Sequence, residues 1–199
     1  MKYTIDTKYA DLWQEAFKYQ DFRNDRGHAF IVTLYAQDIC TYEKANPAVV
    51  IPAAILHDVG WSKVPHEDRM LAFVYGVDKE KMLRIRNQHQ DEGVRLAREI
   101  LTKLVYPADL IDPILEIISQ HDTRKCFISS DEGAMRDADK LWRFDDHGFL
   151  NDNQNGGYDF KTDLQALEKK LADPKFMYFE SSYKRAWDML HHLQSKYLS

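Results

Sequence analysis

The sequence lacks long apolar runs and paired cysteines. No run of apolar residues approaches the ~20 that a helix needs to cross a bilayer. The N-terminal stretch MKYTIDTKYADLW has no apolar core of the kind that signal peptides carry. Its two cysteines, Cys40 and Cys126, belong to no CxxC pair. These absences predict a protein without a membrane partner in a reduced, cytoplasmic compartment.

Basic residues are also in deficit. The 27 Lys and Arg residues against 32 Asp and Glu residues give a formal net charge of -5. This balance argues against an extended nucleic-acid surface but leaves room for one small basic pocket. The length of 199 residues, with 44% hydrophobic residues, suits one domain with a substantial core. We therefore predict a single domain over residues 1–199, and a homo-oligomer is compatible with the sequence.

Helical periodicity dominates what is present, whereas repeats, low-complexity tracts and persuasive strands are missing. Pro52 predicts a kink or a later start in the helix that contains it, and Gly60 is expected to close that helix. The polar stretch NDNQNGGYD, residues 151–159, is typical of a loop. The fold class predicted is all-α. The expected helices cover about residues 7–19, 25–44, 47–58, 78–104, 108–121, 129–146, 163–172 and 175–197, with a short one within 61–76.

Four histidines occupy the inward faces or ends of these predicted helices. His28, His89 and His121 each lie in line with apolar residues at helical spacing. Each alone would more often be a core or capping histidine. His57 and Asp58, however, end a very apolar helix, where an ionisable pair is costly without compensation. Neutral imidazoles and carboxylates are ligands of divalent transition metals, so the set predicts a metal centre.

One further carboxylate is ambiguous. Asp139 shares a helix face with Met135 and Trp142, whereas Asp137 shares a different face with Leu141. Periodicity alone does not choose between the two aspartates.

These residues, in this order, resemble the HD superfamily of metal-dependent phosphohydrolases. The pattern H…HD…D is carried by His28, His57-Asp58 and Asp139, and the strings AAILHDVG, HQDEGVRLAREIL, IISQHD and RDADKL support it. The resemblance covers roughly residues 26–143 and selects Asp139, the second aspartate of DAD. It implies an all-α, HD-domain-like helical bundle, with a motif-bearing core at about 22–147 and a C-terminal helical extension at about 160–197.

The resemblance also implies a divalent metal cofactor, one or two ions of Mn, Fe, Co, Ni or Mg. A single ion would be held by His28, His57, Asp58 and Asp139. In some relatives two further histidines hold a second ion, with the aspartate of the HD pair bridging. His89 and His121 occupy these places, and in single-metal members such histidines contact the substrate or its leaving group instead. Both alternatives stay open at this stage.

The reaction implied is hydrolysis of a small phosphorylated metabolite, with a nucleotide as the expected substrate. Asp58 would orient water, and unligated His89 or His121 would donate a proton or bind an oxygen. Phosphate also needs cationic contacts, and the cations nearest in sequence to the ligands include Lys63, Arg124 and Lys140.

Two other functions compete with this one. Some HD proteins with the same six ligands hold two irons and use oxygen to oxidise a substrate. A non-catalytic binding or regulatory module would need a broken ligand set, whereas the set in this sequence is intact.

Overall fold

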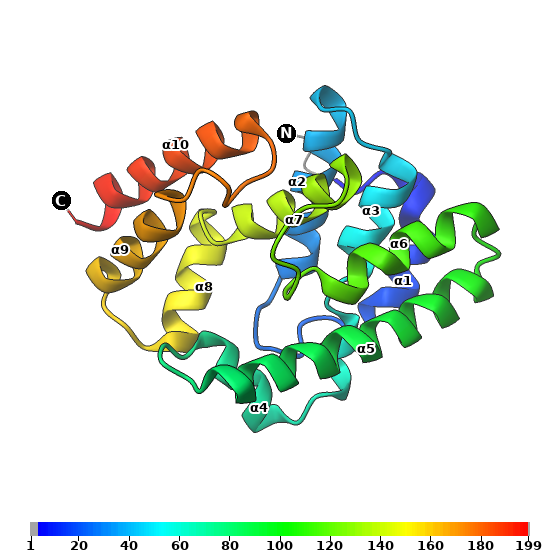
Figure 1. Cartoon of the computed structure of the whole chain (residues 1–199), viewed down its shortest axis with the longest axis horizontal. Coiled ribbons are helices and arrows are strands. Elements are labelled where there is room, and N and C mark those ends of the chain that lie inside the picture. The colour runs from blue at the N-terminus through cyan, green and yellow to red at the C-terminus, as the bar shows by residue number, and fades with distance from the viewer. Residues whose placement is uncertain (1–3, 199) are drawn as a thin grey trace.

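The computed structural model describes residues 4–198, and helices make up its regular structure (Figure 1). Over this range no strand is present, so the all-α prediction is confirmed. Three short 3₁₀-helices are η1 (Thr7–Tyr9), η2 (Val59–Lys63) and η3 (Leu71–Phe73). The α-helices are α1 (Ala10–Phe17), α2 (His28–Tyr42), α3 (Pro47–Leu56), α4 (His66–Met70), α5 (Lys79–Lys103), α6 (Ala108–Gln120), α7 (Ser130–Trp142), α8 (Asp146–Gly156), α9 (Phe160–Leu171) and α10 (Glu180–Tyr197).

Helix α3 forms the centre of the core because it is apolar on every face. All of its residues from Val49 to Leu56 are buried. Helices α1, α2, α6 and α7 pack around it, and α5 packs against α6 and η2. Helices α9 and α10 form a pair at the other end of the molecule, next to α8 (Figure 1). None of the described helices combines the length and the hydropathy that crossing a bilayer requires.

Pro52 lies inside α3 without delaying its start, because the polar group that it leaves free has another partner. Proline has no N–H, so the carbonyl of Ala48, four residues earlier, loses its partner within the helix. The hydroxyl of Tyr106 donates to this carbonyl at 2.8 Å. A tertiary contact therefore compensates for the proline.

Gly60 has a role that differs from the predicted closure of α3. The helix ends at Leu56, and Gly60 lies within η2. A Cβ atom on Gly60 would come within 1.9 Å of the carbonyl oxygen of His89 and 2.5 Å of the nitrogen of Gly93. Gly60 is therefore required by the close approach of η2 to α5.

The predicted loop at 151–159 is wrong for residues 151–156, which belong to α8. The side chain of Asp145 caps the start of this helix by accepting from the His147 N–H. Phe149 packs against Phe160 and Tyr197, and the amide of Asn153 donates to the carboxylate of Asp163 at 2.7 Å. Helix α7 ends at Trp142 and α10 begins at Glu180, so both are shorter than predicted, whereas α9 begins at Phe160, earlier than the predicted residue 163.

Candidate metal centre

The ends of helices deliver most of the candidate ligands to one point. His28 is the first residue of α2, and His57 and His121 are the C-cap residues that directly follow α3 and α6. Asp58 follows His57, so the side chains of neighbouring residues can converge there. The interiors of α5 and α7 contribute the remaining two, His89 and Asp139. The structure thus brings together the six ligand candidates predicted from the sequence.

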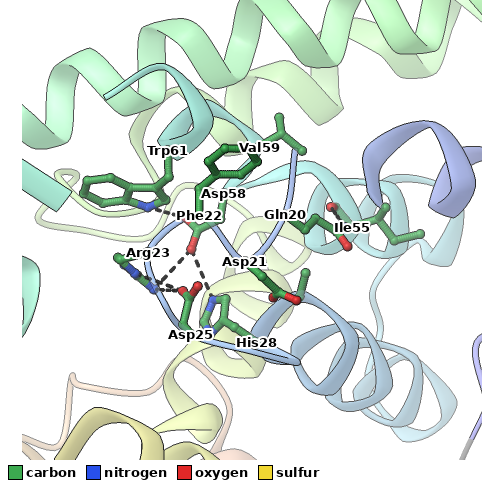
Figure 2. Close-up of a pocket in the computed structure, with 11 residues that line it drawn as sticks. Gln20, Asp21, Phe22, Arg23, Asp25, His28, Ile55, Asp58, Val59 and Trp61 are labelled. Carbon is green, nitrogen blue, oxygen red and sulfur yellow. Dashed lines mark hydrogen bonds and ion pairs between the residues drawn. The ribbon is translucent and has the colours of Figure 1, made fainter. Parts of the chain in front are cut away.

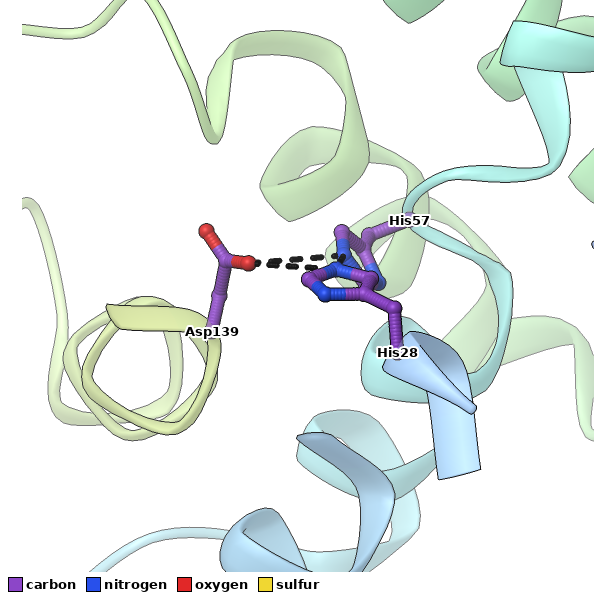
Figure 3. A group of neighbouring side chains, drawn as sticks. All are labelled: His28, His57 and Asp139. Atoms are coloured by element: carbon purple, nitrogen blue, oxygen red, sulfur yellow. Dashed lines mark hydrogen bonds and ion pairs between the residues drawn. The ribbon is translucent and has the colours of Figure 1, made fainter. Parts of the chain in front are cut away.

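One half of the centre, the first group, consists of His28, His57, Asp58 and Asp139. The Nε2 atoms of His28 and His57 lie 3.0 Å apart. Asp139 Oδ1 lies 3.4 Å from His28 Nε2 and 3.7 Å from His57 Nε2, so that it faces both rings from one side (Figure 3). Asp58 Oδ2 lies 3.3 and 3.5 Å from the same two nitrogens.

The other half, the second group, consists of His89, His121, Asp58 and Asp122. The Nε2 atoms of His89 and His121 lie 3.3 Å apart. Asp58 Oδ1 lies 3.7 Å from His89 Nε2 and 3.4 Å from His121 Nε2. Asp122 Oδ2 lies 3.7 Å from His89 Nε2. Each oxygen of Asp58 therefore faces a different pair of histidines.

Asp122 was not among the ligand candidates predicted from the sequence. The signal was present, because His121-Asp122 is a second His-Asp pair at the end of a helix. Gln90 fixes the backbone at Asp122, since its side-chain oxygen accepts a hydrogen bond from the Asp122 N–H at 3.1 Å.

Two of the histidines have a fixed tautomer when they are neutral. His57 Nδ1 lies 2.9 Å from the carbonyl oxygen of Ala54, and His121 Nδ1 lies 2.9 Å from that of Ile118. A carbonyl only accepts, so each Nδ1 is the donor, and each Nε2 directs a lone pair at the centre. His89 is held differently, with its ring stacked on Trp61 at 4.1 Å between centroids.

The centre needs positive charge. Burial raises the pKa of Asp58 and of Asp139, but the surrounding histidines, together with Arg23 at Asp58, outweigh burial and hold both pKa values well below the ordinary range. Burial opposes charge on His28, yet Asp139 and Asp58 raise its pKa to about 10. Without a metal, protons would have to neutralise this cluster. Converging lone pairs beside ionised carboxylates are a donor set that fits divalent metal ions.

The geometry separates the two aspartates between which periodicity did not choose. Asp139 faces His28 and His57 (Figure 3). Asp137 is buried elsewhere and accepts the N–H groups of Tyr178 at 2.8 Å and Phe179 at 2.9 Å, just before α10. The first is a ligand candidate and the second stabilises a helix start.

Arg23 is a site residue that sequence reasoning missed. Its Nη2 lies 2.9 Å from Asp25 Oδ2 and 3.3 Å from Asp58 Oδ2 (Figure 2). Its guanidinium also lies over the ring of Trp61, 5.1 Å from the centroid. These residues line a pocket of about 10 Å³ beside His28. Arg23 precedes α2 in a segment without helical periodicity, so no pattern indicated it.

The centre borders a larger cleft of about 420 Å³. His121, Asp122 and Asp139 form part of its lining. The walls come from the segment 72–77, the start of α5, and helices α7, α8 and α9, and they include aromatic rings such as Tyr75 and Tyr158. The cations that line the cleft are Arg23, Arg86, Arg136, Lys140, Arg143 and Lys170.

Of the three predicted phosphate contacts, Lys140 lines this cleft and the other two lie outside its lining. Lys63 is exposed, with its ammonium over the ring of Tyr19. Arg124 pairs with Glu116 and lies 3.2 Å from Glu132. The prediction for Lys63 and Arg124 relied on their closeness in sequence to ligand candidates, and this closeness does not bring them to the cleft.

The comparisons with known proteins agree with this geometry. The model of the family described as HD domain matches residues 26–143, more than half of the chain. The matched range contains His28, His57-Asp58, His89, His121 and Asp139. Searches of curated proteins and of solved structures found no match. The chain belongs to the HD domain family, the superfamily of metal-dependent phosphohydrolases.

Proposed function

We propose that the protein hydrolyses a small phosphate ester in a metal-dependent reaction, with a nucleotide as the substrate. The observation that supports this is the combination of a His/Asp cluster with a cleft that contains cations and aromatic rings. Arginine and lysine bind phosphate oxygens through charge-assisted hydrogen bonds, and aromatic faces stack on bases. A volume of about 420 Å³ is within the range of small-molecule sites.

In this proposal each of the two groups would hold one ion, and Asp58 belongs to both groups. Support comes from the two oxygens of Asp58, which face different histidine pairs at 3.3 to 3.7 Å. When bound, divalent metals supply charge neutralisation at phosphoryl oxygens and lower the pKa of water. The alternative role of His89 and His121 as substrate contacts is distinguished by the metal content of their variants.

Arg23 and Lys140 are the proposed phosphate contacts at this end of the cleft. Arg23 presents a planar fork that suits two phosphoryl oxygens, and its contacts with Asp25 and Asp58 fix its position. Lys140 follows the ligand candidate Asp139, and its ammonium donates to the carbonyl of Phe176. Arg23 therefore replaces Lys63 and Arg124, which the sequence predicted, as a phosphate contact in this proposal.

A screen of phosphate esters tests the proposal. The purified protein is treated with EDTA, reloaded with Mn²⁺, Co²⁺, Mg²⁺, Ni²⁺ or Fe²⁺, and assayed for release of phosphate or pyrophosphate from nucleotides and simpler esters. We expect release that depends on metal and stops with EDTA. Arg23→Gln should lower kcat/KM about 10- to 100-fold at unchanged metal content, as the loss of one buried charge-assisted bond predicts.

Lys63→Gln serves as the matched control, because it removes one charge from a cation outside the cleft. Its kcat/KM should stay within about twofold of the wild-type value. Absence of metal-stimulated hydrolysis, together with substrate-dependent oxygen uptake by the iron-loaded protein, would replace this proposal by the oxygenase alternative.

A further inference from the structure

Three cations meet in the cleft on walls that belong to different elements. Arg86 comes from α5, Arg143 ends α7, and Lys170 comes from α9. We call them the cationic trio.

The cationic trio has little compensation within residues 4–198. Neither Arg86 nor Lys170 has an ion pair or a hydrogen bond through its side chain in this range, and Arg143 reaches Asp152 only at 3.7 Å. Asp152 also accepts from the indole of Trp142 at 3.2 Å. Asp163 accepts from the hydroxyl of Tyr75 at 2.8 Å and from the amide of Asn153 at 2.7 Å. Asp152 and Asp163 therefore already have other partners, and Asp122, on which Arg86 acts, belongs to the second group.

The members of the trio act on one another. Desolvation by the surrounding cleft lowers the pKa of Lys170, and the charges of Arg143 and Arg86 lower it further, to about 8. The side chain of Lys170 is nevertheless accessible to solvent from the cleft. Asp152 and Asp163 oppose this effect without cancelling it. Like charges held together in a concave site are unfavourable in the free protein and raise the local concentration of anions. The arrangement is accounted for when an anionic ligand completes it.

We infer that the cationic trio binds a second phosphate of the substrate, so that the preferred substrates carry two phosphate groups. The inference rests on the proposed function for the place of the first phosphate, at the His/Asp centre beside Arg23 and Lys140. Arg86 lies near enough to Asp122 to act on its carboxylate, so the trio begins beside the second group and continues along the cleft to α9. Arg86 and Arg143 each have a planar guanidinium group, which can donate two parallel hydrogen bonds to the oxygens of one phosphate.

A binding measurement on the full-length, metal-containing protein tests the inference without turnover. The probes are α,β-methylene-ADP, which carries two phosphoryl groups, and the 5′-phosphonate analogue of AMP, which carries one. Calorimetric titration should give a Kd for the first probe at least about tenfold below that for the second. Arg86→Gln and Lys170→Gln should each weaken the first probe about tenfold and leave the second within about twofold.

Arg84→Gln and Lys169→Gln are the matched controls. Both residues are exposed, lie on the same two helices, and are outside the lining of the cleft. They remove the same charge, so a general electrostatic effect would appear in them too. We expect them to leave both Kd values within about twofold.

Four results would overturn the inference. These are wild-type binding of neither probe, equal affinity for both probes, equal weakening of both probes in the cleft variants, and controls that behave as the cleft variants do. If the ester screen is negative while the expected binding pattern is seen, the second phosphate site stands and only the proposed hydrolysis fails. If hydrolysis is found without discrimination between the probes, the proposed function stands and this inference fails.

Discussion

Asp58 is the residue on which both halves of the centre depend. Its carboxylate oxygens lie within 3.7 Å of an Nε2 atom of each of the four histidines. Side chains of neighbouring residues within a helix diverge by ~100°. Because α3 ends at Leu56, this limit does not apply to His57 and Asp58, and both side chains can point at the centre. A helix that continued through Asp58 would separate the two side chains.

Asp137 and Asp139 of α7 give a test at the same scale. Asp139→Asn should reduce the metal content, because it removes a charged oxygen that faces His28 and His57. Asp137→Asn should retain the metal and lower the free energy of unfolding by about 1–3 kcal/mol, since the N–H groups of Tyr178 and Phe179 lose a charged acceptor. Metal analysis and urea denaturation measure the two effects. Loss of metal from Asp137→Asn alone would show that the assignments are reversed.

Among single residues, the sequence predicted those that lie on a helix or directly at its end, and it missed Arg23 in the segment before α2. His28 and His89 stand in line with apolar neighbours, so periodicity predicted their burial. Arg23 and Asp25 lie between α1 and α2, where no period applies. Distance along the chain also misled, since Lys63 follows Asp58 closely yet lies outside the cleft.

At the scale of elements, the centre depends on how closely η2 approaches α5. Gly60→Ala should lower the free energy of unfolding by about 3 kcal/mol, because its Cβ atom would overlap backbone atoms of His89 and Gly93. Gly93→Ala would meet a methyl group of Ile118 at 3.3 Å, which can move, and Ala is the better helix former. Its effect should therefore stay within about 1 kcal/mol. Urea denaturation measures the free energy of unfolding of both variants. An equal loss in Gly60→Ala and Gly93→Ala would contradict this explanation.

The helices that could be predicted from the sequence are those whose apolar face repeats along their length. Helices α5 and α6 show such a face, and both were located to within a few residues. Helix α8 was missed because contacts from distant segments stabilise it. Asn151 and Asn155 donate to the carbonyl of Asn24 at 3.1 and 3.0 Å, a contact that no local pattern indicates.

For the whole molecule, the pKa values of the centre predict an unusual pH dependence without metal. Burial opposes charge on His28 and His121, but nearby carboxylates outweigh it and raise their pKa values to about 10 and about 9. Both exceed the unfolded value of about 6.5, so their stabilisation is complete below that pH and is lost as pH rises through the folded values. The EDTA-treated protein should therefore lose about 1–3 kcal/mol of unfolding free energy between pH 7 and 8.

Urea denaturation of the EDTA-treated protein from pH 7 to 8 measures this slope. Above pH 8 the lowered pKa values of Lys140 and Lys170, both about 8, act in the opposite direction, so the window ends there. His28→Gln combined with His121→Gln should flatten the slope. Stability of the EDTA-treated wild type that stays constant or rises from pH 7 to 8 would contradict the described electrostatics.

If the His/Asp set gathered at the helix ends binds two metals, the number of bound ions per chain is the decisive quantity. Mass spectrometric metal analysis of the wild-type protein, loaded and then desalted, should find about two divalent ions per chain. His121→Ala should retain about one, and Asp58→Ala should retain neither ion tightly. A wild type that binds no metal under any loading, or a content that is unchanged in both variants, would contradict the account.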